Sequence, residues 1–200
     1  MSDLRIGIIL GSTRPGRKGE APARWLLDIA KERGDAQYDL VDLADFELPL
    51  LDEVNMPSQG NYENAHTKAW AKTIDQYDGF VFVTPEYNHG MPAALKNAID
   101  FLYAEWNNKA AAFVSYGSEG GVRAVEQLRQ VMAQVRIADV GSAATLSLAE
   151  DFVNYTEFRP RDFQEQSVRT MLDELISWST ALRSLRGRSG TGQGALAATP

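Results

Sequence analysis

The sequence contains no cysteine, which excludes disulfide bonds, thiolate metal sites, CxxC redox chemistry and a cysteine nucleophile. Histidine is almost as scarce. His66 and His89 are the only two, and neither has acidic neighbours at metal-binding spacing, so we expect no bound metal. The apolar runs are all too short to cross a membrane, and the N-terminus enters a strand pattern without the features of a signal peptide. We therefore expect a cytoplasmic protein with no membrane partner.

Positive charge is also in short supply. The 20 lysines and arginines are outnumbered by 27 aspartates and glutamates, and the net charge of −7, without an obvious basic patch, argues against nucleic acid as a partner. With 44% apolar residues, the 200-residue chain can bury a sizeable core. We expect one domain over residues 1–186, followed by a disordered tail over residues 187–200, where Gly, Ser, Thr and Ala dominate.

Short apolar segments and amphipathic segments alternate strictly along the chain. The pattern predicts strands near residues 4–10, 37–42, 79–83, 110–115 and 138–146. It predicts helices near residues 20–33, 62–76, 92–103, 120–134 and 162–186. Such alternation builds right-handed parallel crossovers. We therefore expect an α/β fold with a five-stranded parallel sheet in the order 2-1-3-4-5 and helices on both faces. The connection over residues 45–61 is unusually long and is a candidate contact segment.

A turn rich in glycine, hydroxyl groups and positive charge follows the first predicted strand. Residues 11–19 read Gly-Ser-Thr-Arg-Pro-Gly-Arg-Lys-Gly and lead into a helix, whose N-terminal N–H groups attract anions. Ser12 and Thr13 add hydroxyl donors, and Arg14 and Arg17 add forked cationic donors suited to phosphate. The lysine comes one place too late for a P-loop, and Thr13 stands where a dinucleotide-binding turn needs its second glycine. We interpret the turn as a phosphate cradle, although taken alone it fits a tight turn with solvated arginines equally well.

Two further turns follow predicted buried strands. Residues 84–92 read Thr-Pro-Glu-Tyr-Asn-His-Gly-Met-Pro, a rigid polar loop framed by prolines. Residues 115–121 read Ser-Tyr-Gly-Ser-Glu-Gly-Gly, where glycine allows a ring to approach the backbone closely. In open α/β sheets, ligands bind beyond the carboxyl ends of the strands. Three such turns at one crevice favour a flat, hydrogen-bonding ligand with a phosphate, such as a flavin, over a set of purely structural turns.

These residues carry a resemblance to a known family. The Gly-Ser-Thr-Arg start of the first turn, the Pro-Glu-Tyr-Asn-His-Gly block at residues 85–90 and the Pro-Ala-Ala-Leu-Lys-Asn-Ala-Ile-Asp run at residues 92–100 are similar to the NADPH-dependent FMN reductase family. The similarity spans roughly residues 4–145. It implies a flavodoxin-like fold and the activities of a family that includes flavin, quinone, azo and chromate reductases. Arg17 and Gly19 depart from it, because many members carry serine and asparagine there.

The resemblance implies FMN as the cofactor, NADPH or NADH as the electron donor, and a homodimer or homotetramer. A hydride would pass from the nicotinamide to the flavin, and the electrons would then reach a small-molecule acceptor such as a quinone, an azo compound, free flavin or a metal oxyanion. Because the flavin carries the chemistry, we expect no catalytic side chain. The implied FMN contacts are Ser12, Thr13, Arg14 and Arg17 at the phosphate, Pro85, Glu86, Tyr87 and Asn88 at the ring and ribityl chain, and Ser115, Tyr116 and Gly117 beside them.

Two other functions stay open at this point. A flavodoxin-type electron carrier would bind FMN without a pyridine nucleotide site. Flavodoxins usually have a hydroxyl-rich phosphate loop with little positive charge, so Arg14 and Arg17 favour the reductase. A flavin-free interaction module of the same fold would be colourless and indifferent to added FMN.

Overall fold

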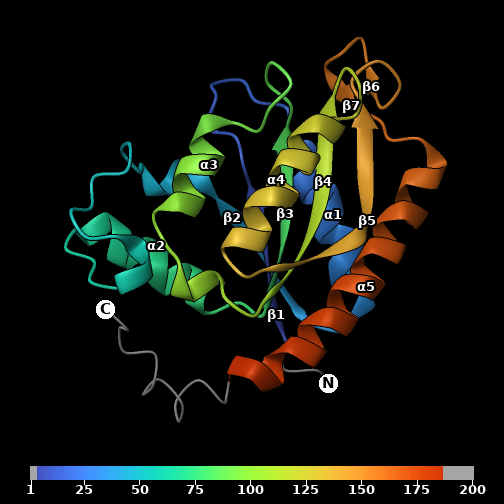
Figure 1. The fold of residues 1–200 in the computed structure, drawn as a ribbon. Coiled ribbons are helices and arrows are strands. Elements are labelled where there is room, and N and C mark those ends of the chain that lie inside the picture. Colours follow the sequence, from blue (N-terminus) through green and yellow to red (C-terminus); the bar gives the residue numbers. More distant parts are fainter. Residues whose placement is uncertain (1–3, 187–200) are drawn as a thin grey trace.

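The fold is built on a central parallel sheet (Figure 1). The computed structural model describes residues 4–186. Its strands are β1 (Arg5–Leu10), β2 (Gln37–Asp42), β3 (Gly79–Pro85), β4 (Ala110–Gly117), β5 (Ala138–Ser147), β6 (Phe152–Val153) and β7 (Glu157–Phe158). Its α-helices are α1 (Glu20–Arg33), α2 (Ala65–Asp75), α3 (Ala93–Asp100), α4 (Val122–Gln134) and α5 (Asp162–Arg186). Short 3-10 helices lie in the connections: η1 (Leu43–Phe46), η2 (Pro57–Gln59) and η3 (Ala104–Trp106).

Every pairing in the main sheet is parallel. β1 pairs with β2 and β3, and β4 pairs with β3 and β5, which gives the order β2-β1-β3-β4-β5. The central strands β1, β3 and β4 are buried along nearly their whole length. Uninterrupted apolar runs suit such strands, because helices cover them on both faces. The predicted α/β class, number of main-sheet strands and strand order are confirmed.

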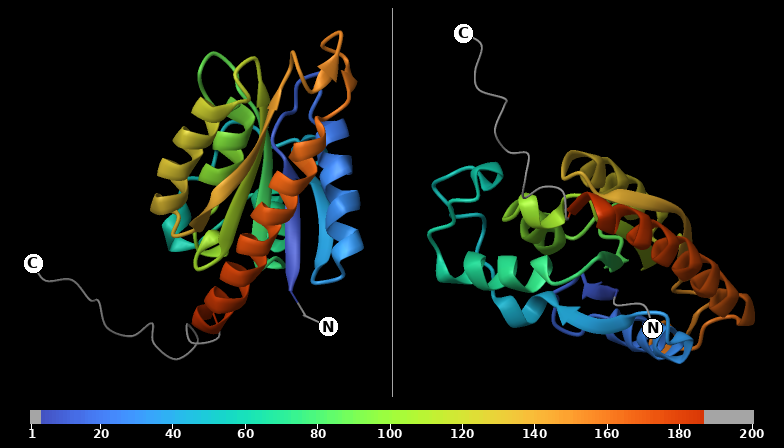
Figure 2. Two further views of the ribbon diagram at one scale, coloured as in Figure 1. Left: turned by 90° about the vertical axis from the view of Figure 1, so that its right-hand side faces the viewer. Right: turned by 90° about the horizontal axis from the view of Figure 1, so that it is seen from below.

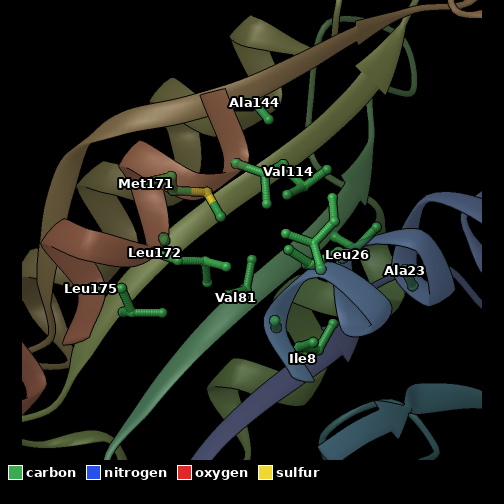
Figure 3. Packing of buried hydrophobic residues seen from close by; sticks show 14 of the residues in the cluster. Ile8, Ala23, Leu26, Val81, Val114, Ala144, Met171, Leu172 and Leu175 are labelled. Atoms are coloured by element: carbon green, nitrogen blue, oxygen red, sulfur yellow. The ribbon is translucent and has the colours of Figure 1, made fainter. Parts of the chain in front are cut away.

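Two apolar layers fill the space between the sheet and its helices. α1 and α5 cover one face of the sheet, and α2, α3 and α4 cover the other (Figure 2). The first layer is mainly aliphatic, and its fully buried members include Ile8, Leu26, Val81, Val114 and Leu172 (Figure 3). The second layer is rich in aromatic rings, and its fully buried members include Trp70, Phe80, Phe82, Trp106 and Phe113. Close packing on both faces gives the turns at the strand ends a rigid base.

Some element boundaries differ from the sequence pattern. β3 runs through Pro85 instead of ending at residue 83. The Glu86 N–H donates to the Tyr116 carbonyl on β4. Because N–H groups alternate in direction along a strand, the N–H that Pro85 lacks would point to the β1 side, beyond the last β1 pair, so no sheet hydrogen bond is lost. The helix predicted to reach residue 103 ends at Asp100. The pattern does not predict β6 and β7, because two-residue strands are too short to show alternation.

Within residues 4–186, no helix combines the length and the apolar character that crossing a membrane requires. The predicted disordered tail over residues 187–200 lies outside the described residues.

Candidate functional site

The turns that follow β1, β3 and β4 meet at the carboxyl edge of the sheet (Figure 1). We name them, after the contacts predicted from the sequence, the phosphate turn (residues 11–19), the flavin turn (residues 85–91) and the glycine turn (residues 115–121). The flavin turn includes the last residue of β3, and the glycine turn includes the last three residues of β4. The Gly11 N–H donates to the Val83 carbonyl at 2.9 Å, and the Glu86 N–H donates to the Tyr116 carbonyl at 3.1 Å. These bonds extend the sheet into the turns, so the structure brings all three predicted turns to one place.

The phosphate turn closes on itself at its tip. The Arg17 N–H donates to the Arg14 carbonyl at 3.1 Å, and Gly16, between them, has a φ of +68°. Pro15 followed by a glycine with positive φ is the combination that a type II turn favours. α1 then begins at Glu20 without a side-chain cap, so its first N–H groups are open to an anion.

Ser12 is buried and connects the phosphate turn to the flavin turn. Its Oγ accepts from the Arg14 N–H at 3.3 Å and lies 2.8 Å from the Tyr87 hydroxyl. When Tyr87 donates in that pair, the hydrogen of Ser12 stays free for another acceptor. Thr13 and Arg14 are exposed. The Arg14 guanidinium lies 5.9 Å from the centre of the Tyr87 ring and has no carboxylate partner within residues 4–186. This part of the turn therefore offers donors to a ligand.

Arg17 also lies in the phosphate turn, but the protein itself takes up its guanidinium. It donates to the Ser12 carbonyl at 2.9 Å, to Glu20 at 3.1 Å and to Asp42 at the end of β2. The side chain is only 11% exposed. The guanidinium of Arg17 is thus engaged within the chain, whereas that of Arg14 is open to solvent.

The tip of the flavin turn is a tight hairpin. The Tyr87 N–H donates to the Gly90 carbonyl at 2.9 Å, and the Gly90 N–H donates to the Tyr87 carbonyl at 3.0 Å. Between them, Asn88 (φ +50°) and His89 (φ +67°) are both in the left-handed region, as the central residues of a type I′ turn must be. Two successive non-glycine residues with positive φ store strain, and such strain clusters at functional sites.

Two side chains of α4 hold the flavin turn in this shape. Gln127 donates from Nε2 to the His89 carbonyl at 3.0 Å and accepts at Oε1 from the Met91 N–H at 3.3 Å. One helical turn earlier, Arg123 donates to the Glu86 carboxylate from Nε at 2.6 Å and from its backbone N–H at 3.1 Å. The Glu86 side chain is only 7% exposed, so its carboxylate is committed to α4. Arg123 and Gln127 were not predicted from the sequence, where their only signal is the four-residue spacing that puts both on one helix face.

The side chains of the glycine turn mostly serve the fold. The Ser115 hydroxyl is buried and donates to the Gly120 carbonyl at 2.6 Å. Tyr116 is buried too, and its ring reaches the start of α1, where a Cβ added to Gly19 would lie 2.7 Å from the hydroxyl. Burial raises the pKa of Tyr116, and its hydroxyl donates to no acceptor among the described residues. Gly117 is also buried. The Ser115 hydroxyl is therefore engaged within the turn, and the Tyr116 ring is packed in the interior.

Among the hollows that open beside these turns, two border the phosphate turn or the flavin turn. The larger, about 600 Å³, lies between the flavin turn and the glycine turn and has the size of a small-molecule site. It is lined by Glu86, Asn88, His89, Ser118, Glu119, Val122 and Arg123. The smaller, about 230 Å³, adjoins the phosphate turn at Thr13 and is otherwise lined by η1, the residues just after it and α3. Both hollows therefore border residues that the sequence analysis selected.

The sequence is similar to a family model and to several curated proteins. Residues 4–151 match the family model described as NADPH-dependent FMN reductase. An NAD(P)H-dependent FMN reductase of Schizosaccharomyces pombe is 44% identical over 146 residues, which cover 71% of this chain and 73% of the relative. A quinone reductase of Escherichia coli is 36% identical over 135 residues, which cover 64% of this chain and 69% of the relative.

A solved structure shares the fold. The flavoenzyme FerB of Paracoccus denitrificans, an NAD(P)H:(acceptor) oxidoreductase, superposes with a TM-score of 0.69 at 20% identity, covering 89% of this chain and 98% of that chain. Together with the strand order, this likeness confirms the predicted flavodoxin-like fold. Because the family model covers residues 4–151, well over half of the sequence, the chain belongs to the NADPH-dependent FMN reductase family, oxidoreductases that use FMN and NAD(P)H.

Proposed function

We propose that this chain binds FMN across the three turns, oxidises NAD(P)H and reduces a quinone. The observation that carries the proposal is the pair of hydroxyls of Ser12 and Tyr87, 2.8 Å apart, because it joins the phosphate turn to the flavin turn. A ligand that carries both a phosphate and a ring needs two binding sites side by side, one for each part. The choice of a quinone as acceptor is supported by the Escherichia coli relative, which is named quinone reductase.

The residues at this edge of the sheet fit FMN. A phosphate dianion would find the uncapped N-terminus of α1, the exposed guanidinium of Arg14 and the hydroxyls of Ser12 and Thr13. The ring and ribityl chain would contact Pro85, Tyr87 and Asn88 of the flavin turn, largely through backbone groups. α4 holds the neighbouring Glu86 carboxylate and His89 carbonyl, so the turn can meet a flat ring without first being ordered.

FMN held in these turns would supply the redox chemistry between NAD(P)H and the acceptor. The role of the chain itself is to bind FMN and to orient it toward its substrates. Gln127 and Arg123 hold the flavin turn, and the apolar layers on both faces of the sheet fix the positions of the three turns relative to one another. We assign no catalytic side chain.

We also propose that the chain assembles as a homodimer or homotetramer. Support comes from the long connection between β2 and α2, where Leu50, Val54 and Met56 are 83%, 86% and 63% exposed. Several large apolar side chains exposed within one segment favour a protein contact. Size-exclusion chromatography with light scattering measures the mass in solution, and a monomer at micromolar concentration would contradict the proposal.

Reconstitution with FMN tests the proposed activity. The purified protein should turn yellow and should oxidise NADPH in the presence of menadione far faster than a protein-free mixture. A yellow protein with negligible turnover would instead act as an electron carrier, and a colourless protein that ignores added FMN would be a flavin-free module. Stopped-flow reduction with NADH and with NADPH in separate runs then gives the preferred donor.

A further inference from the structure

Arg17 occupies the phosphate turn without being open to a ligand. A guanidinium has five N–H donors. That of Arg17 makes four hydrogen bonds within the chain: two to Glu20, one to the Ser12 carbonyl and one to Asp42. The side chain is 11% exposed. A side chain with this many bonds and this little surface is held in a single orientation by the fold.

Asp42 fixes Arg17 from the neighbouring strand. Its Oδ2 accepts from Arg17, and its Oδ1 accepts from the Ala44 N–H at 2.9 Å, where η1 begins. Asp42 ends β2 and pairs in register with Leu10, which ends β1. The Asp42 side chain is 20% exposed, so solvent and salt screen this ion pair less than a surface pair. The pair therefore ties the turn after β1 to the end of β2.

The bond from Arg17 to the Ser12 carbonyl matters for an anion site. A carbonyl oxygen carries partial negative charge and repels a phosphate at close range. Arg17 binds this oxygen at 2.9 Å, which neutralises it in part and fixes its direction. The donors of Ser12, Thr13 and Arg14 thus belong to a turn that is ordered before a ligand arrives. Such pre-ordering removes part of the entropy cost of binding.

We propose that Arg17 is a positioning residue for the FMN phosphate: together with Asp42 it orders the phosphate turn, and it does not itself bind the phosphate. The inference rests on the proposed FMN site, in which Arg14 supplies the cationic contact. The competing role for Arg17, a direct bond to the phosphate, makes the opposite prediction for a change at Asp42.

Asp42→Asn separates the two roles. Asparagine keeps an oxygen for the Ala44 N–H, so the start of η1 is preserved, but the charge that holds Arg17 is lost. If Arg17 orders the turn, loss of its ion pair with Asp42 weakens binding, and we expect the Kd for FMN to rise roughly fivefold to tenfold. A direct ligand released from a competing carboxylate, with one negative charge fewer near the phosphate, would instead bind FMN more tightly. Tighter or unchanged FMN binding by Asp42→Asn therefore overturns the proposal.

A second variant and a matched control complete the test. Arg17→Met should raise the Kd for FMN by a similar factor. The double variant Arg17→Met/Asp42→Asn should have a Kd no higher than that of the single variant with the higher Kd, because both changes remove the same brace. Losses that simply add overturn the proposal. Asp39→Asn is the control: it removes the carboxylate that pairs with Arg5 at 2.8 Å, on the same two strands but nearer to their amino ends. Its Kd for FMN should change by less than about twofold.

The measurement is a titration of apoprotein by quenching of flavin fluorescence, below the thermal midpoint of every variant. Riboflavin is titrated in parallel, and its Kd should change by less than about twofold in Asp42→Asn because it has no phosphate. Equal losses for both ligands would mean general damage and would overturn the proposal. Where Arg17→Met does not fold, Arg17→Lys provides the same comparison, since lysine keeps the charge without the fork. A parent protein that does not bind FMN defeats the proposed function itself, whereas tight FMN binding by parent and Asp42→Asn alike defeats the brace alone.

Discussion

Replacing Arg14 by alanine should weaken FMN binding while leaving the fold intact. Arg14 is exposed and has no carboxylate partner within residues 4–186, so the folded chain loses little more than a contact with the Tyr87 ring, whose centre is 5.9 Å from the guanidinium carbon. An exposed contact of this kind is worth about 1 kcal/mol at most. The free energy of unfolding should therefore stay close to that of the parent protein.

The effect on the ligand should be larger. A hydrogen bond to a charged group contributes about 1.5–3 kcal/mol, so the Kd for FMN should rise about 10- to 150-fold. Arg17 is already engaged with Asp42 and cannot take over the lost contact without breaking that pair. Riboflavin carries no phosphate, and its Kd should change much less.

Paired titrations of apoprotein with FMN and with riboflavin measure both effects. Arg14→Lys is the matched control: it keeps the charge but not the fork, so its affinity for FMN should fall between those of the parent and Arg14→Ala. The FMN affinity of Arg14→Ala should also depend less on salt than that of the parent, because one phosphate-facing charge is gone. Equal losses for FMN and riboflavin would refute the reasoning, and so would an unchanged affinity for FMN.

Three further changes test other parts of the molecule. Asp151→Asn should lower the free energy of unfolding by about 2–3 kcal/mol, because its carboxylate is fully buried and accepts hydrogen bonds from Arg161 and from backbone N–H groups; urea denaturation at neutral pH measures the loss, and stability equal to the parent's would contradict it. Burial lowers the pKa of Lys109 to about 8, so between about pH 8 and pH 10 the unfolded chain binds more protons than the folded chain and the free energy of unfolding should rise with pH. Lys109→Met should flatten that rise, and identical pH profiles of the two proteins would argue against the assignment. Gln127→Ala should speed hydrogen exchange across residues 87–91 without a large fall in the thermal midpoint, because both of its bonds to the flavin turn disappear; exchange followed by mass spectrometry would show no change if the clamp were unimportant.

Local patterns in the sequence sufficed for the sheet and for the placement of the turns. The runs at residues 79–83 and 110–115 are apolar at nearly every position, which central strands covered on both faces require. Once the strands are known to be parallel, their carboxyl ends must share one edge, so the three turns had to meet. The FMN reductase family, predicted from the turns, is confirmed by the match over residues 4–151.

Side-chain partners could not be predicted in the same way, because they depend on contacts between distant segments. Besides Glu20, Arg17 pairs with Asp42, 25 residues away on another strand, and Glu86 pairs with Arg123, 37 residues away on α4. No local spacing predicts either pair, and both pairs engage side chains that the sequence assigns to the ligand. The individual FMN contacts, the homodimer or homotetramer and the cytoplasmic location stay predictions.

The hydroxyl pair of Ser12 and Tyr87 has a consequence for how a cofactor is selected. A serine that gives its hydrogen to an anion can only accept from the tyrosine, which sets the direction of the Tyr87 O–H and tethers one loop to the other. Binding of a phosphate at Ser12 would thus orient a side chain of the flavin turn, which the phosphate itself does not contact. A flavin without a phosphate would find the Tyr87 hydroxyl less well oriented beside its ring. Its loss of binding free energy would then exceed that of the missing phosphate contacts alone.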